Sequence, residues 1–165
     1  MNPPGQSLFR LIYRSRQTFP VAANLDHFVR NIIRSAVPNN RGDDLTGLLI
    51  TIQGHFIQAL EGPVDAVRNT YAKISMDLRH HDPHIISQGP VGQRLFSDWN
   101  MCARALAPSD QAILDVIDAK GGFRPDRLTP QSVERLLTTV ADIQRRVSLD
   151  ASAGIASAKA PQGIA

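Results

Sequence analysis

The sequence predicts an α+β fold of the ferredoxin-like type, in which two helices cover one face of a five-stranded sheet and further helices follow. Two stretches, 25–36 and 64–74, repeat apolar residues at the spacing of an amphipathic helix. Short apolar runs around them give the order β-α-β-β-α-β-β. With 165 residues, 42% hydrophobic and 20% charged, the chain suits one soluble domain with a modest tail.

The first half of the chain supplies three strands and one helix. Phe9, Leu11 and Tyr13 alternate with residues of the opposite face, which predicts the first strand. A loop over 16–24 leads to Asn24, a suitable N-cap for the first helix, and Pro38 is expected to end that helix. After a polar turn, the apolar runs 45–52 and 55–60 predict a hairpin closed at residues 53–54.

The second half continues the pattern and then changes character. Pro63 suits the first turn of a second helix, which we expect to end at residues 80–84. The last two strands are predicted at 85–88 and 99–105. The domain therefore covers residues 8–105, after a flexible start at 1–7. A helical extension over 106–148 follows, with helices at 109–118 and 129–147, and then a tail at 149–165 that we expect to be disordered.

Composition excludes several classes of protein. The single cysteine, Cys102, rules out an internal disulfide framework and a multi-cysteine zinc site, and is either a small strand residue or a reactive thiol. The apolar runs are too short to span a bilayer, and no signal peptide is visible, so we expect a cytoplasmic protein without a membrane partner. A net charge of +3 without a basic block does not indicate nucleic acid. His80, His81 and His84 lack a recognised ligand spacing, so no metal site is expected.

Polar side chains fall where the predicted core should be. Gln58 lies between Phe56 and Leu60 on one face of its strand, and Tyr13 shares the corresponding face of the first strand. A buried amide needs partners, because each unsatisfied group costs about 1–3 kcal/mol. Backbone groups or water can supply them, but an amide beside a phenol also suits a planar heterocyclic ligand. Trp99 and Met101 share a face of the last predicted strand and can join this layer.

Other polar residues have a structural and a functional interpretation. Asn39 and Asn40 suit a simple turn, or place two amides at the mouth of a cleft between the helices. Asp77, Arg79 and His80 are expected to close the second helix and can border the same cleft, although the two basic residues also complement the helix dipole. No phosphate-binding loop, nucleophile elbow or pair of catalytic carboxylates is visible, so we do not expect an enzyme.

Several motifs together resemble the BLUF domain, a blue-light sensor that uses flavin. The most specific are Phe-x-Gln-x-Leu-Glu-Gly-Pro over 56–63 and Asp-Trp-x-Met over 98–101. Residues 11–15, 39–40, 45–49 and 77–80 also match, in the order of the family. The resemblance covers residues 8–105, which is more than half of the chain.

The resemblance implies a role for each matching residue. Tyr13 would donate an electron and a proton to the excited flavin, and Gln58 would lie between this phenol and the ring. Trp99 and Met101 would respond to light through their packing near Gln58. The residues implied in cofactor binding are Tyr13, Ile32, Asn39, Asn40, Gln58, Ile74, Asp77, Arg79 and His80. Rearrangement of the Gln58 amide would shift the absorption of the flavin slightly to the red.

The resemblance also implies the cofactor and the type of output. FAD is expected, with FMN or riboflavin as alternatives, because Ala36 and Pro38 depart from the pattern of the family. No output domain is recognised in the chain, so the signal would pass to a separate protein partner, and a homo-oligomer and a bacterial source are expected. Two alternatives stay open, a light-independent interaction module with the same fold and a small-molecule enzyme. Bound flavin without turnover in the dark would separate these three interpretations.

Overall fold

The computed structural model describes residues 7–107, 109–116 and 123–158 and contains one mixed five-stranded sheet. The strand order is β4-β1-β3-β2-β5, with antiparallel pairs except for β2 and β5, which are parallel. The elements are β1 (Leu8–Gln17), α1 (Phe19–Ala23), α2 (Leu25–Gly42), β2 (Thr46–Ile52), β3 (His55–Pro63), α3 (Val64–Ser75), β4 (His80–Pro90), β5 (Cys102–Leu106), α4 (Gln111–Asp115), a 3-10 helix η1 (Pro125–Arg127) and α5 (Pro130–Ala158).

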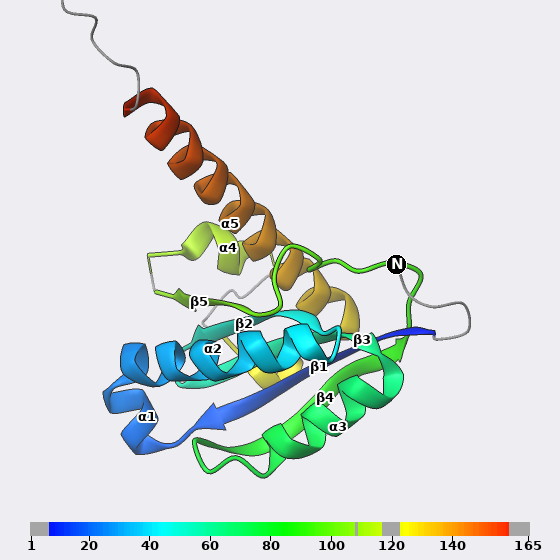
Figure 1. The fold of residues 1–165 in the computed structure, drawn as a ribbon. Helices are drawn as coiled ribbons and strands as arrows, with labels where there is room; N and C mark the ends of the chain where they lie inside the picture. The colour runs from blue at the N-terminus through cyan, green and yellow to red at the C-terminus, as the bar shows by residue number, and fades with distance from the viewer. Residues whose placement is uncertain (1–6, 108, 117–122, 159–165) are drawn as a thin grey trace, which may run out of the picture.

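The sheet separates two layers of helices. Helices α2 and α3 lie on one face, whereas α4 and α5 lie on the other (Figure 1). Each layer has its own apolar core, which we call the α2/α3-side core and the α5-side core. In β3, Phe56 and Leu60 belong to the first core and Ile57 and Ala59 to the second, as strand alternation requires. The predicted α+β fold with two helices on one sheet face is therefore confirmed.

The first long helix extends further than the sequence predicts. Pro38 lies inside α2, which ends at Gly42, so Asn39 and Asn40 lie in its last turn and not in a separate turn. An interior proline costs about 3 kcal/mol. Two hydrogen bonds of Asn40 offset part of this cost, since its carbonyl accepts from Leu45 N at 2.7 Å and its Nδ2 donates to the Asn100 carbonyl at 2.7 Å. The expected loop 16–24 also contains the short helix α1.

The second long helix is shorter than predicted, and the strand after it is longer. Helix α3 ends at Ser75, so Asp77 and Arg79 lie in the connection and His80 is the first residue of β4. The Arg79 amide donates to Asp77 Oδ1 at 2.9 Å, and the Arg79 carbonyl accepts from Thr18 N at 3.2 Å. These bonds turn the chain and pair it with the end of β1, which starts the strand early.

The prediction that Trp99 and Met101 share a face of the last strand is wrong. Strand β5 begins only at Cys102, and the two residues precede it in the connection from β4. Trp99 packs against the α5-side core, whereas Met101 is buried in the α2/α3-side core. Gly47 permits this approach, because a Cβ there would lie 2.2 Å from the Ala59 carbonyl oxygen and 3.0 Å from Cε of Met101.

The C-terminal extension ends in a long helix. Helix α5 begins at Pro130 and continues to Ala158, so residues 149–158 of the expected disordered tail are helical. This stretch is rich in alanine, which has the highest helix propensity. Residues 1–6 of the expected flexible start, residues 159–165 and the predicted helix end at 117–118 lie outside the described residues. Among the described helices, none has the length and apolar composition needed to cross a membrane.

Candidate functional site

A cavity of about 540 Å³ lies between α2, α3 and the sheet. This volume is within the range of small-molecule and cofactor sites. Its walls come from both helices, from β1, β2 and β3, and from the connection into β4. The lining residues are Tyr13, Ile32, Ser35, Ala36, Pro38, Asn39, Asn40, Gly42, Asp43, Leu49, Phe56, Gln58, Leu60, Thr70, Lys73, Ile74, Asp77, Arg79 and His80.

A short chain of hydrogen bonds forms the floor of the cavity. Tyr13 and Gln58 are direct partners in the register of β1 and β3, and both are buried. The Tyr13 hydroxyl donates to Oε1 of Gln58 at 2.6 Å. Nε2 of Gln58 donates to Sδ of Met101 at 3.4 Å, and its second N–H makes no hydrogen bond with a described residue. The amide is therefore fixed from two sides and keeps one donor for a ligand.

The environment keeps Tyr13 protonated. Burial raises the pKa of its phenol well above the usual value, and the nearby Tyr71 and Asp77 raise it further, whereas Arg79 lowers it. The ring of Tyr71 lies 5.2 Å from that of Tyr13, centroid to centroid. Tyr71 makes no hydrogen bond to Gln58. Tyr13 is therefore the phenol that donates a hydrogen bond to the amide.

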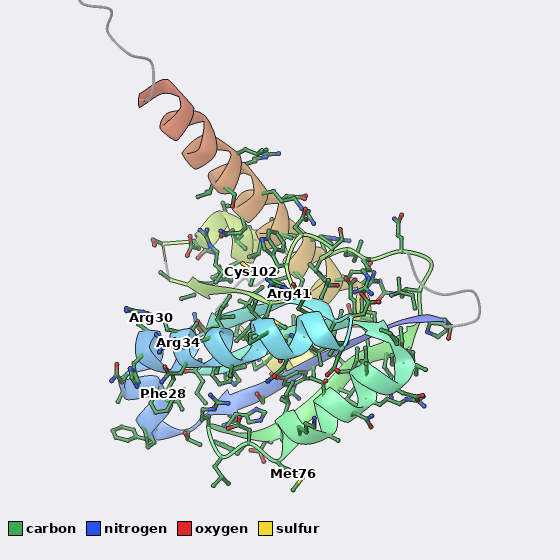
Figure 2. All side chains as sticks on the ribbon, in the orientation of Figure 1. Phe28, Arg30, Arg34, Arg41, Met76 and Cys102 are labelled. Atoms are coloured by element: carbon green, nitrogen blue, oxygen red, sulfur yellow. The ribbon has the colours of Figure 1, made fainter. Side chains whose placement is uncertain are left out.

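Asparagine side chains form another wall. Asn40 is buried, and its Nδ2 donates a hydrogen bond to the Asn100 carbonyl. No described residue donates to its Oδ1. Asn100 also donates from Nδ2 to the Leu45 carbonyl at 3.0 Å, and Arg41 reaches toward its Oδ1 from the end of α2 (Figure 2). Asn39 is exposed at the mouth. The cavity thus has an amide acceptor in this wall.

The connection from α3 to β4 closes the other end with charged groups. Arg79 donates from Nε to Asp77 Oδ1 at 2.9 Å and also from its Nη2 to Oδ2. These hydrogen bonds lower the pKa of the Asp77 carboxyl. The flanking Met76 and Leu78 are exposed, and Met76 points away from the body (Figure 2). The connection therefore turns its charged residues to the cavity and its apolar ones outward.

His80 is held in one tautomer beside this wall. Nε2 of its ring lies 2.5 Å from the Ile74 carbonyl oxygen, to which it donates, and Nδ1 lies 2.7 Å from the Ser15 hydroxyl. Because the carbonyl only accepts, Nε2 carries a proton, and the Ser15 hydroxyl, which can donate or accept, is the partner of Nδ1. His80 is buried, whereas His81 and His84 are exposed. Among the described residues, no group of three or more potential metal ligands converges.

The structure places eight of the nine predicted cofactor-binding residues in the walls at full or half burial, with Asn39 at the exposed rim. Ile32 and Ile74 line the cavity from the two opposite helices. Met101 reaches the floor through Gln58, but Trp99 is not among the lining residues and lies on the α5 side.

Sequence reasoning also missed polar side chains that line the cavity or support it from behind. Lys73 lines the mouth, is exposed and makes no ion pair with a described residue, and its position one residue before Ile74 was the available signal. Asn100 holds Asn40 through its carbonyl, which no pattern in the sequence indicates. Glu61 is fully buried and accepts hydrogen bonds from the amides of Leu95 and Phe96 at 2.8 and 3.0 Å.

The arrangement suits a flat ligand with polar edges. Apolar side chains from α2, α3 and the sheet supply faces for a ring, and Gln58 and Asn40 offer a donor and an acceptor. Lys73 adds a positive charge near the opening, which suits a phosphate, whereas the charge of Arg79 is balanced there by its ion pair with Asp77. The isoalloxazine ring of FAD and its diphosphate have this combination of properties, so the residues present fit this cofactor.

The chain is similar to known proteins. Residues 8–102 match the family model for sensors of blue light using FAD, the BLUF domain. The chain is 34% identical over 138 residues to photoactivated adenylate cyclase subunit beta of Euglena gracilis, a match that covers 80% of this chain and 16% of that protein. The alpha subunit from the same organism is 31% identical over 136 residues, covering 79% of this chain and 13% of that protein. The chain thus spans less than a fifth of the length of these relatives.

Solved structures have the same fold. The dark-state structure of the BLUF protein BlrB has a TM-score of 0.65 and 29% identity, and the match covers 83% of this chain and 97% of that one. The photo-activated state of BlsA has a TM-score of 0.70 at 24% identity, with coverages of 80% and 93%. A bacterial light-regulated adenylyl cyclase has a TM-score of 0.60 and 28% identity over 67% of this chain and 33% of its own.

Proposed function

The chain belongs to the BLUF family of sensors of blue light using FAD, and from this premise we propose that its response to light begins at Tyr13 and Gln58. The observation that carries the proposal is the 2.6 Å hydrogen bond between these two buried side chains on the floor of the cavity. A phenol and an amide held this closely form a path for one proton. The signal would then leave the cavity through Met101, the other partner of the amide.

The cavity residues divide into those that would hold the ring and those that would hold the phosphates. Ile32 and Ile74 would pack against the two faces of the ring, while Oδ1 of Asn40 would accept a hydrogen bond from its polar edge. Asn39, Asp77 and His80 would complete the walls. Lys73 at the mouth would neutralise a phosphate, which favours FAD or FMN over riboflavin, and Arg79 would keep its ion pair with Asp77.

The bound flavin supplies the absorption of blue light and, once excited, a strong oxidant. The phenol of Tyr13 is neutral because burial raises its pKa. Loss of an electron makes a phenol strongly acidic, so its proton would move along the short bond to Oε1 of Gln58. After the electron and the proton return to Tyr13, the amide would be left in a rotated or tautomeric form with a changed set of donors.

We infer that the output is a protein contact and not a reaction catalysed by this chain. Residues 8–105 would form the sensor and 106–148 the extension that a partner or a second copy recognises. The relatives support signalling to an effector, since their names describe light-activated cyclases. A bacterial source and a cytoplasmic setting are part of this proposal, and similarity to a bacterial light-regulated cyclase supports the first.

Absorption spectra in the dark and after blue light test the roles of the two residues. The wild-type protein should show a flavin spectrum that shifts slightly to the red and returns in darkness. Tyr13→Phe and Gln58→Leu should bind flavin but lose the shift, because the proton path is broken. Tyr71→Phe is the matched control, since it removes a neighbouring phenol that has no hydrogen bond to Gln58.

Three outcomes would contradict the proposal. Protein that cannot be reconstituted with FAD would favour the alternative interpretation, a light-independent interaction module. A flavin that binds and only bleaches would mean that the cavity holds the cofactor but that the hydrogen-bond chain does not respond. Loss of the shift in Tyr71→Phe, with the shift kept in Tyr13→Phe, would move the donor role to the second tyrosine.

A further inference from the structure

The connection between β4 and β5 is where the two sides of the sheet communicate. Within four residues, it contributes Met101 to the α2/α3-side core and Trp99 to the α5-side core. Met101 contacts the Gln58 amide, and the Asn100 carbonyl accepts from Asn40 in the cavity wall. A shift of Met101 therefore cannot leave Trp99 unaffected, because only one residue separates them.

Arg145 of α5 holds the far side of the same connection. Its Nε donates to Oδ2 of Asp98 at 2.6 Å, and its Nη2 donates to the Leu95 carbonyl at 2.7 Å. The guanidinium carbon lies 5.3 Å from the centroid of the Trp99 ring, which is the geometry of a cation–π contact. Nη1 donates to Asp142 on the same helix, which orients the group. One side chain thus binds three residues of the connection.

The near end of the connection has a separate anchor. Glu61 in the sheet accepts hydrogen bonds from the amides of Leu95 and Phe96, and Phe96 is fully buried. Leu95 is therefore held at its amide by the sheet and at its carbonyl by α5. The Trp99 backbone is tied to the Phe96 carbonyl and to Gly47 N of β2, at 3.3 and 3.1 Å. The side chains of Asp98 and Trp99 have Arg145 as their partner, so these side chains can move while the Leu95–Phe96 end stays fixed.

We propose that Arg145 is a positioning residue that makes α5 sensitive to the state of Gln58, and we call its contacts with Leu95, Asp98 and Trp99 the Arg145 clasp. The proposal rests on the proposed light response of Gln58. When the amide turns, its carbonyl oxygen replaces the NH2 group against the sulfur of Met101. Two acceptors then face each other, so Met101 loses its donor and shifts.

The shift would open the Arg145 clasp and loosen the helix. Movement of Met101 would displace Asn100 and Trp99. Arg145 would then lose its cation–π contact with the Trp99 ring and its hydrogen bond to the Asp98 carboxylate together. Beyond Arg145, Val147 and Leu149 are exposed, and the end of α5 projects past the sheet (Figure 1). The two states differ by a few contacts, so light would change their populations and not the fold.

Amide hydrogen exchange over residues 142–149, measured in darkness and under blue light, tests the Arg145 clasp. In the wild-type protein loaded with FAD, exchange should be about tenfold faster in light, the effect of losing one contact of this strength. Arg145→Gln should exchange fast in both conditions while it keeps the red shift of the flavin. Arg146→Gln is the matched control, because this exposed neighbour makes no hydrogen bond or ion pair with a described residue.

Two further variants separate coupling from simple stabilisation. Arg145→Lys keeps the charge but not the planar fork, so part of the light-dependent difference should remain. Met101→Leu removes the sulfur acceptor, so the difference in exchange between darkness and light should be lost. A red shift in the wild-type protein with equal exchange in both conditions would overturn the clasp alone, as would a wild-type light response in Arg145→Gln. No red shift in the wild-type protein would overturn the proposed function and the clasp with it.

Discussion

Glu61→Gln should destabilise the protein strongly, although the two side chains have the same shape. Glu61 is fully buried, and its carboxylate accepts from Arg10 Nε at 2.8 Å, from the amides of Leu95 and Phe96, and from the Thr46 hydroxyl at 3.3 Å. All four partners donate. A glutamine offers one oxygen and one NH2 group, so at least one buried donor must then face another donor.

The magnitude follows from the groups left unpaired. In the least costly orientation, the NH2 group faces Phe96 N, which loses its acceptor at a cost of about 1–3 kcal/mol. The hydrogen bonds to Arg10 and Leu95 lose their charged acceptor, which takes away about another 1–2 kcal/mol in total. We therefore expect a loss of about 4 kcal/mol, a large part of the roughly 5–15 kcal/mol of a typical domain.

Urea unfolding at pH 7, followed by far-UV circular dichroism, measures this loss. Glu134→Gln is the control, because Glu134 is the exposed partner of the same arginine and its removal should cost less than about 1 kcal/mol. A loss below about 1 kcal/mol for Glu61→Gln, or an equal loss for both variants, would refute the reasoning about buried donors.

Three other predictions concern the cavity. Because burial raises the pKa of Tyr13, its phenol stays protonated when the unfolded chain deprotonates. Tyr13 should therefore lower the free energy of unfolding by about 1.4 kcal/mol per pH unit above pH ~10. Tyr13→Phe should remove this contribution in alkaline urea titrations, and Tyr71, whose pKa burial also raises, should leave a smaller slope. Asn100→Ala keeps the carbonyl that binds Asn40 but removes the Leu45 contact, so FAD affinity measured by fluorescence should fall about threefold to tenfold. Lys73→Ala should weaken FAD and FMN by a similar factor and leave riboflavin unchanged in the same titration; equal loss for all three ligands would exclude a phosphate contact.

The order of the elements and the two sheet faces could be predicted because alternation along a strand is a local property. Phe56, Gln58 and Leu60 face one side whatever the rest of the chain does. The ends of the elements depended on distant partners instead. Pro38 predicts the end of a helix, but the bonds from Asn40 to Leu45 and Asn100 carry the helix past it.

The same division applies to the site. Tyr13 and Gln58 were recognisable because polar residues at core positions are unusual, and the structure makes them direct neighbours. Trp99 could not be placed, because its side depends on where β5 begins to pair with β2, and the paired residues, such as Leu48 and Cys102, are 54 residues apart in the sequence. That pairing starts at Cys102, which leaves Trp99 free to turn to the other core. Arg145 contacts a connection that is 47 residues away, so no local pattern indicates it.

The sheet separates the cavity from helix α5, which bears on how the helix can be exchanged. All cavity residues lie on one side of it, and the far side presents an apolar surface that α5 covers with Val133, Leu136, Leu137 and Val140, all fully buried. A different helix with four apolar residues at this spacing, and one arginine about one and a half turns further on, would meet the same requirements. The flavin-binding half can thus be attached to a new regulatory target by exchanging one helix, with no change to the residues that hold the cofactor.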